Sequence, residues 1–206
     1  MKSFKIIVSL LTSVFSFSAL HAQKGKTSFS IEYNVGVPMG SFKDNVSNTS
    51  FRGFQAAVLH GLSDKFSIGF GTGFQDFYQK DPRQLYKFSD GSDVSAVVTH
   101  SIQIIPLLVT GKYSFTPGGA VQPYAALGAG GNMISYAELL GQFGGTQTKF
   151  GFAARPEAGV YIPFSKTGEA GLTLGASYNI MPFNQDNFSN LNHVGLHAGV
   201  NIPLRK

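Results

Sequence analysis

Apolar side chains alternate with polar or small ones along much of the chain, and this period of two residues constrains the fold most. In FSIEYNVGV, residues 29–37, every odd-numbered position is aromatic or aliphatic and every even-numbered position is polar or glycine. Successive side chains of a β-strand point to opposite faces, so the pattern predicts a strand with one apolar face. The alternation returns in residues 66–75, 150–162, 170–180 and 193–202, and the apolar row of these five segments carries no charge.

Three less regular segments complete the set of expected strands. They span residues 51–60, 97–115 and 121–136, which makes eight candidates in total. The connections alternate in length, with long polar ones at residues 38–50, 79–93, 137–148 and 181–192, and short ones at 61–65, 116–120 and 163–168. Short turns at one end and long loops at the other are typical of outer-membrane barrels. The sequence therefore predicts an all-β fold, an eight-stranded antiparallel up-and-down transmembrane β-barrel with short periplasmic turns and long external loops.

Composition decides between a membrane barrel and a soluble one. Charged residues make up 13% of the chain, against about 25% in typical soluble domains. A soluble ligand-binding barrel would hold the apolar row inside and would show water a surface of glycine and serine, poor in charge. A membrane barrel turns the apolar row toward lipid and the polar row toward the lumen. We expect the membrane barrel; a soluble secreted barrel is the alternative.

The N-terminus predicts export. Lys2 and Lys5 precede an apolar core that runs from Ile6 to about Leu20, and Ala22 offers a cleavage point. Residues 1–22 are predicted to be a signal peptide, and residues 23–206 the barrel domain. The chain has no cysteine, which excludes disulfides and thiolate metal sites.

Two charges stand inside the otherwise apolar and small stretch KFGFAARPEAGVYIPF. Arg155 and Glu157 are two residues apart and thus share the lumenal face of one strand. The lumen of an eight-stranded barrel is just wide enough to be filled by side chains, and a charge there requires a partner. We expect an internal polar network that plugs the lumen, and its predicted members are Glu32, Lys112, Arg155, Glu157, Glu169 and His197. A charge-lined narrow channel is the alternative.

The stretches VGVPMGSF, SIQIIPLLVTGKYSF, VQPYAALGAGG and FAARPEAGVYIPF carry a family resemblance. They resemble the strand and turn signatures of small outer-membrane β-barrel domains, the PorT-like and OmpX-like barrels of Gram-negative bacteria. The resemblance covers nearly the whole mature chain and implies an outer-membrane location and eight antiparallel strands. The chain departs from many such barrels by ending in NIPLRK instead of an aromatic residue.

Prolines mark the places where the strands are expected to be irregular. Pro106, Pro123 and Pro156 fall inside or at the start of expected strands, and a closed barrel has no free edge for a residue that lacks an N–H. We expect a bulge or a strand end at each. The apolar phase changes between Ile104 and Leu107, which favours a bulge at Pro106.

No chemistry-bearing motif accompanies this architecture. His193 and His197 lie about 13 Å apart along one strand, too far to share a metal ion, and residues 128–131 (GAGG) lack the residues of a phosphate-binding loop. We expect no catalytic activity, no cofactor, no metal and no nucleic-acid partner. The predicted role is a monomeric structural or interaction barrel in outer-membrane lipid, whose loops meet an unidentified protein or surface ligand through Lys80, Arg83 and Lys87.

Overall fold

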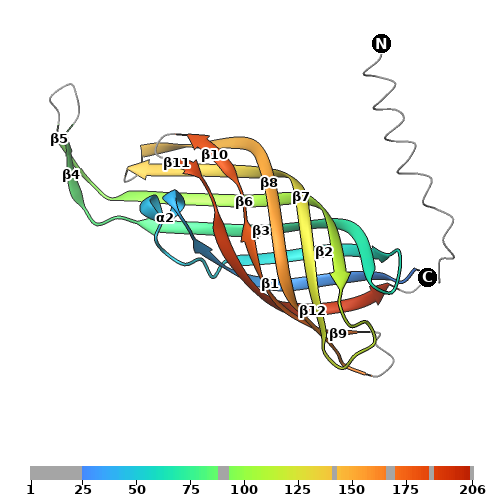
Figure 1. The fold of residues 1–206 in the computed structure, drawn as a ribbon. Coiled ribbons are helices and arrows are strands. Elements are labelled where there is room, and N and C mark those ends of the chain that lie inside the picture. The colour runs from blue at the N-terminus through green and yellow to red at the C-terminus, as the bar shows by residue number, and fades with distance from the viewer. Residues whose placement is uncertain (1–24, 88–92, 141–142, 166–169, 186–187, 205–206) are drawn as a thin grey trace, which may run out of the picture.

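Eight long antiparallel strands close into a barrel (Figure 1), in the order β1-β12-β9-β8-β7-β6-β3-β2. The computed structural model describes residues 25–87, 93–140, 143–165, 170–185 and 188–204. The predicted signal peptide lies outside these residues and stays a prediction. The wall strands are β1 (Thr27–Pro38), β2 (Gly53–Gly61), β3 (Phe66–Lys80), β6 (Val98–Ser114), β7 (Gln122–Leu140), β8 (Phe143–Pro163), β9 (Gly171–Asn179) and β12 (His193–Leu204). Each corresponds to one predicted strand, so the predicted barrel is confirmed.

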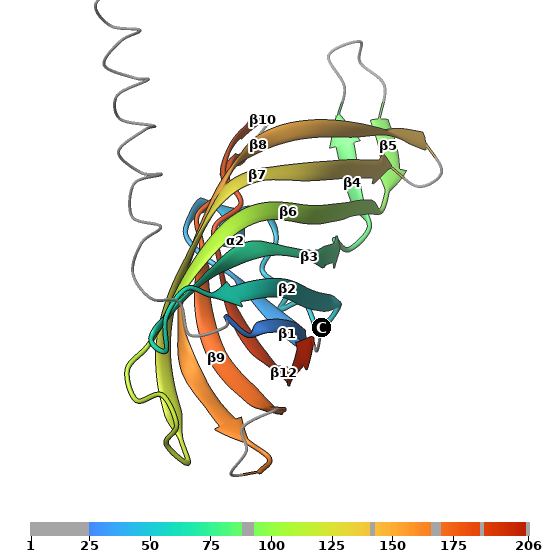
Figure 2. The ribbon, with the colours of Figure 1, turned by 90° about the vertical axis from the view of Figure 1, so that its right-hand side faces the viewer.

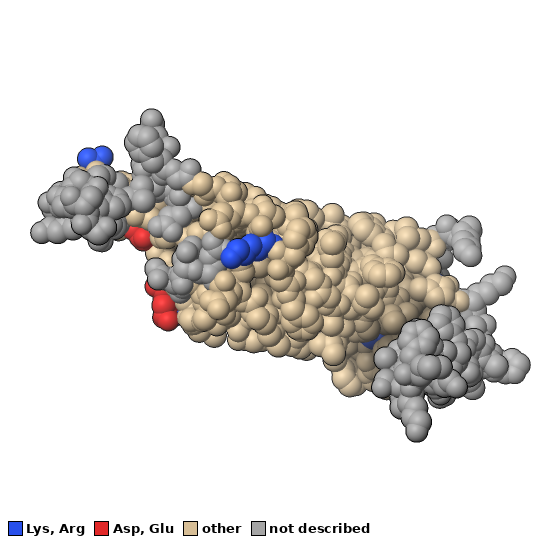
Figure 3. All heavy atoms as spheres, turned by 90° about the horizontal axis from the view of Figure 1, so that it is seen from above, with Lys and Arg blue, Asp and Glu red and all other residues tan. Residues whose placement is uncertain are grey.

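The outer wall is apolar, as the alternation predicts. Phe70 is 73% exposed and Phe152 is 54% exposed, and Ile31 and Leu174 also stand outward from their strands. Most of the wall visible in Figure 3 is uncharged. Large apolar side chains exposed around a closed barrel are stable only against lipid, so this surface is the membrane-facing one.

A row of polar residues marks the external limit of the apolar wall. Its members come from five neighbouring strands or their ends: Arg52, Asp76, Gln103, Ser135 and Thr148. The next row toward the membrane is apolar and includes Phe54, Phe74, Met133 and Phe150. Because the rows follow the strand register, the change from apolar to polar occurs together on all five strands. This boundary places the edge of the hydrocarbon layer.

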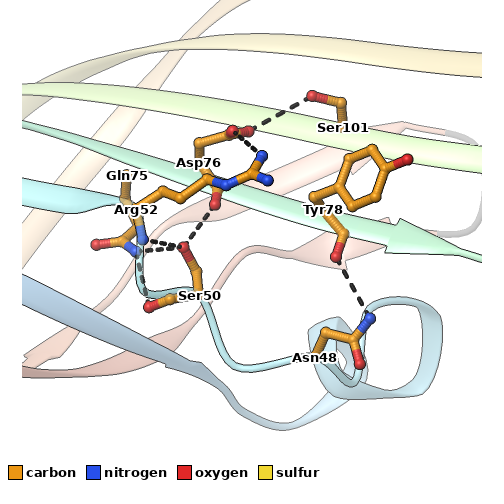
Figure 4. A network of polar contacts seen from close by, with 7 residues as sticks. All are labelled: Asn48, Ser50, Arg52, Gln75, Asp76, Tyr78 and Ser101. Carbon is orange, nitrogen blue, oxygen red and sulfur yellow. Dashed lines mark hydrogen bonds and ion pairs between the residues drawn. The ribbon is translucent and has the colours of Figure 1, made fainter.

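Polar contacts tie the boundary together at β2 and β3 (Figure 4). The Nη1 atom of Arg52 lies 3.3 Å from Oδ2 of Asp76, and its guanidinium lies 5.6 Å from the centre of the Tyr78 ring. Behind this pair, Ser50 donates a hydrogen bond to the carbonyl of Asp76 and accepts one from Gln75. The loop that follows β1 is thereby held against β3.

Four of the strands continue beyond the polar row as an external sheet, which we call the external wall (Figure 2): β3 to Lys80, β6 from Val98, β7 to Leu140 and β8 from Phe143. Residues 137–148 were expected to form a long loop, and that expectation is wrong. Instead β7 and β8 pair without interruption up to Leu140 and Phe143. Thr146, Thr148 and their polar neighbours form an extended strand whose outer face contacts water. The sequence of this strand therefore shows no apolar alternation from which it could be predicted.

The remaining long connections contain short elements that the sequence did not reveal. They are α2 (Ser41–Asn45) after β1, the hairpin of β4 (Gln84–Lys87) and β5 (Asp93–Ala96) after β3, and the hairpin of β10 (Pro182–Gln185) and β11 (Phe188–Asn190) after β9. The turns at the opposite end are short: Gly61 to Phe66 and Ser114 to Gln122. Gly118, with φ 80°, supplies the left-handed backbone that the second turn requires.

The bulge expected at Pro106 is absent. The register between β3 and β6 is the same on both sides of Pro106, with Thr72 opposite Leu107 and Gln75 opposite Ile104. Only the pairs at Gly73 and Phe74 are missing, and the hydroxyl of Thr72 donates to the carbonyl of Pro106 at 2.9 Å. Pro156 likewise interrupts the β8–β9 ladder without shifting it, while Pro123 stands at the start of β7. The change of phase has another cause, because Ile104 points into the lumen.

Apolar side chains fill the external mouth of the barrel. The cluster, which we call the mouth cluster, consists of Phe42, Val46, Phe77, Ile102, Ile104, Leu108, Ile134, Tyr136, Ala153, Met181, Phe183, Phe188 and Leu191. The rings of Phe42 and Phe77 meet edge to face with centroids 4.9 Å apart. The core of this barrel therefore sits at its external end, below α2 and the β10–β11 hairpin.

Candidate functional site

A network of polar and charged side chains fills the lumen below the mouth cluster; we call it the lumenal network. The Nη1 atom of Arg155 donates to Oε1 of Gln55 at 3.1 Å, and its Nε lies 3.7 Å from Oε2 of Glu157. Gln55 in turn donates to Oε2 of Glu32 at 2.8 Å. Arg155 is 6% exposed and Glu32 is 5% exposed, so these charges are buried and paired.

His197 and Tyr124 complete the network on the other side of the carboxylates. The Nε2 atom of His197 lies 3.5 Å from Oε2 of Glu32 and 3.5 Å from Oε1 of Glu157. Tyr124 donates to Oε1 of Glu157 at 2.9 Å, and the ammonium of Lys112 lies 3.9 Å from the centre of its ring. The two carboxylates are thus balanced by one guanidinium and one ammonium.

Small residues on the neighbouring strands make room for these groups. Arg155 stands opposite Gly128 in the β7–β8 ladder, and Glu157 stands opposite Ala126. His197 stands opposite Gly175 of β9, where an added Cβ would lie 2.4 Å from Nε2. The glycines of the lumenal row therefore provide the space in which the polar network is packed.

The structure brings five of the six predicted lumenal residues together. Glu32, Lys112, Arg155, Glu157 and His197 all face this part of the lumen. Glu169 lies outside the described residues. The sequence did not single out Gln55 and Tyr124. Gln55 is the strand-pair neighbour of Glu32, so only the register identifies it.

The residues predicted for external contacts lie at the external end of the molecule. Lys80 ends β3, Arg83 follows it, and both are exposed. Lys87 lies on β4 and pairs through its backbone with Asp93. Beside them, Asp81 lies 3.4 Å from Nε2 of His100 and accepts a hydrogen bond from Gln79.

The loops after β1 and β9 are joined across the mouth of the barrel. The hydroxyls of Ser41 and Ser189 lie 2.7 Å apart, and Asn190 donates to Ser41 at 2.7 Å. The ring of Phe42 meets that of Phe188 with centroids 6.2 Å apart. The lumen is thus closed twice, by the mouth cluster at its external end and by the lumenal network below it.

One group of three side chains among the described residues has the composition of a metal site. Glu32, Glu157 and His197 offer ligand atoms that all lie within 4.8 Å of one another. Their surroundings contain two cations, Arg155 and Lys112. Among the described residues, no helix has the length and apolarity that crossing a membrane requires.

The comparisons with known proteins identify the family. The family model described as outer membrane protein beta-barrel domain matches residues 7–201. Among curated proteins, none matches the sequence significantly. Solved structures of similar fold include two with a TM-score of at least 0.50. Neisserial surface protein A has 16% identity and a TM-score of 0.52, over 90% of this chain and 100% of that one.

The second is Ail, the attachment invasion locus protein of Yersinia pestis, solved in complex with the heparin analogue sucrose octasulfate. It has 12% identity and a TM-score of 0.50, over 88% of this chain and 100% of that one. Identities this low show a shared fold alone. The family match covers almost the whole barrel, and the apolar wall agrees with it. The chain therefore belongs to the outer membrane protein β-barrel domain family and is an integral barrel of the outer membrane.

Proposed function

We propose that this protein is a non-enzymatic outer-membrane anchor that presents the free edge of its external wall to an extended segment of a partner protein. The observation that carries the proposal is the edge of β8. Its pairs with β9 run only from Glu157 to Pro163, with one isolated bridge at Ala154. Among the described residues, no strand pairs with β8 from Phe143 to Ala153 on the side away from β7.

The backbone groups at this edge alternate in direction. Ala154 both donates to and accepts from Ile180 on the β9 side. With the period of two along a strand, the N–H and C=O groups of Thr146, Thr148 and Phe150 point to the same side. These three residues are exposed, and Phe150 is 82% exposed. A strand edge of this kind is a template on which another chain can add a strand.

The edge lacks the usual protections against such pairing. Natural edge strands are shortened, bulged or interrupted by proline and charge, whereas residues 145–150 read GTQTKF with one lysine. Residues 145–147 of this edge lie beyond the polar row, so a partner can approach that part from outside the cell. The lumen, filled by the mouth cluster and the lumenal network, serves in this proposal as a rigid plug instead of a pathway.

Photo-crosslinking on intact cells tests the proposal. A photoreactive residue at Thr146 is expected to crosslink to a protein, and a residue at Ser63 in a periplasmic turn serves as the position control. Thr148→Pro removes an edge N–H without removing a donor to β7, so it should abolish the crosslink. Thr148→Val keeps the N–H and a similar shape and should preserve it. Equal crosslinking of the Pro and Val variants, or none from Thr146, would contradict the proposal.

A further inference from the structure

We propose that Glu32, Glu157, His197 and Tyr124 form a binding site for one divalent transition-metal ion inside the barrel. Four atoms converge there from four strands: Oε2 of Glu32, Oε1 of Glu157, Nε2 of His197 and the hydroxyl of Tyr124. Imidazole nitrogen and carboxylate oxygen are ligands that suit Zn²⁺ and its neighbours in the first transition row, and the phenol oxygen of Tyr124 offers a fourth, weaker donor.

The distances from Nε2 of His197 to its neighbours fit common ligands of one metal ion better than direct hydrogen bonds. Its Nε2 atom lies 3.5 Å from Glu32, 3.5 Å from Glu157 and 3.3 Å from Tyr124. A single ring N–H cannot donate to three acceptors, and hydrogen bonds of this type are normally about 2.7–3.2 Å long. Four ligands at about 2.0–2.2 Å from a tetrahedral ion lie roughly 3.3–3.6 Å from one another. The three contacts of Nε2 match that spacing, whereas Tyr124 and Glu157 stand 2.9 Å apart in a hydrogen bond that a bound ion would have to replace.

Neighbouring residues hold the two carboxylates in place. Arg155 contacts the other oxygen of Glu157, Oε2, and leaves Oε1 turned toward His197. Gln55 donates to Glu32 on the side of the adjacent strand β2. Hydrogen-bonded partners of this kind orient the ligands of metal sites. All four proposed ligands stand on wall strands, so the site needs no rearrangement of a loop.

A small cavity adjoins the cluster. It has a volume of about 30 Å³, which is enough for a water molecule or an ion, and its lining includes Glu32, Glu157, Tyr124 and Lys112. Thr110 also lines it, and its buried Oγ1 has no hydrogen-bond partner among the described residues. The cavity extends toward the periplasmic end of the lumen, to Ser30 and Asn201, which pair between β1 and β12.

The cations of the lumenal network set the expected strength of binding. Glu32 and Glu157 are already balanced by Arg155 and Lys112, so a divalent ion adds positive charge to a neutral cluster. The ammonium of Lys112 lies over the ring of Tyr124, one of the proposed ligands. We therefore expect chelatable binding, and we expect Lys112→Met to tighten it. If the network is only an ionic plug, Lys112→Met should show no metal binding.

Metal titration of the folded barrel tests the site. The mature protein, folded in detergent and stripped with a chelator, is titrated calorimetrically with Zn²⁺, and Co²⁺ is added in parallel to record the visible absorption of a tetrahedral complex. We expect one ion per barrel. Loss of an outer partner of a metal ligand costs about 10–100-fold in affinity. The ligand variant His197→Gln should therefore lose at least about 100-fold, and Tyr124→Phe, which keeps the ring, should also weaken binding.

The controls separate metal binding from folding. His60→Gln alters an exposed histidine that contacts Thr27 at the periplasmic end, and it should bind as the wild type does. Heat-modifiable migration on a gel checks that each variant is folded, and Glu32→Gln replaces His197→Gln if the latter is not. Absence of saturable binding to the wild type would overturn the proposal. Equal binding by the wild type and by the folded ligand variant would overturn it as well.

Discussion

Arg155 connects the two carboxylates of the lumenal network from the β2 side, as His197 does from the other side. It reaches Glu157 directly and Glu32 through Gln55. A buried charge is stable only with its partners, so each member of this network constrains the others. The network holds strands β1, β2 and β8 at fixed positions across the lumen.

Removal of Arg155 alone should therefore destabilise the barrel. Arg155→Met leaves the carboxylate of Glu157 with an unbalanced charge, and the expected loss is about 3–5 kcal/mol of unfolding free energy. The double variant Arg155→Met, Glu157→Gln removes that charge as well and should recover much of the loss. Urea unfolding in detergent measures both. A double variant as unstable as the single one would show that the pair contributes packing and no charge balance.

Lipid contact can be tested on a single strand. Phe152 and Thr148 both face outward on β8, four residues apart, and Thr148 lies in the polar row. Phe152→Arg should cost about 2–4 kcal/mol, because it puts a charge deep in the hydrocarbon, whereas Thr148→Arg should cost about 0–1 kcal/mol. Unfolding from lipid vesicles measures the difference. Equal costs would contradict the position of the boundary.

At the scale of elements, the strands are predictable and the contents of the loops are not. A membrane strand must present an apolar row to lipid. For this reason β1, β3, β8 and β12 can be predicted from the sequence. On β6 the apolar side chains Ile102 and Ile104 face inward, into the mouth cluster, and not toward lipid. In the sequence this looks like a change of apolar phase, which predicts a bulge at Pro106 that the register does not contain. The lumenal network could likewise be predicted only in part. Gln55 and Tyr124 belong to it because the strand register places them beside the charged residues, and the sequence does not give that register.

The external position of the loop after β3 is open to a protease test. Lys80 and Arg83 are exposed at the external end, and Lys65 is exposed in the turn between β2 and β3 at the opposite end. Trypsin added to whole cells should cut after Lys80 or Arg83 and leave Lys65 intact, while broken cells should lose protection at Lys65. Cleavage at Lys65 in whole cells would reverse the assigned orientation.

At the scale of the whole molecule, two closures of different chemistry lie in series along the lumen. The mouth cluster excludes water by apolar packing, and the lumenal network fills the barrel with paired charges. We expect either closure alone to block ions. A barrel closed in this way gains rigidity from its interior, as expected for an anchor.

Conductance measurements test this double closure. The wild-type barrel in a planar bilayer should show no steady ion current. Phe42→Ala removes a fully buried ring of the mouth cluster and should cost about 3–5 kcal/mol of stability. It should still not conduct, because the lumenal network remains below it. Steady current through the wild type would favour the narrow-channel alternative.

The pairing of β1 with β12 determines how the barrel can form. This seam joins the two ends of the chain, from Thr27 opposite Leu204 to Pro38 opposite His193, and thus makes contacts of very long sequence separation. These contacts stabilise the barrel only after nearly every other strand is in place. Closure of the barrel is therefore expected to be the slow step of assembly. Until then, β1 and β12 are two unsatisfied edges within the same chain. The edges of an incompletely assembled barrel must therefore be shielded until β12 is in place. A chain whose synthesis stops before His193 forms a sheet that cannot close.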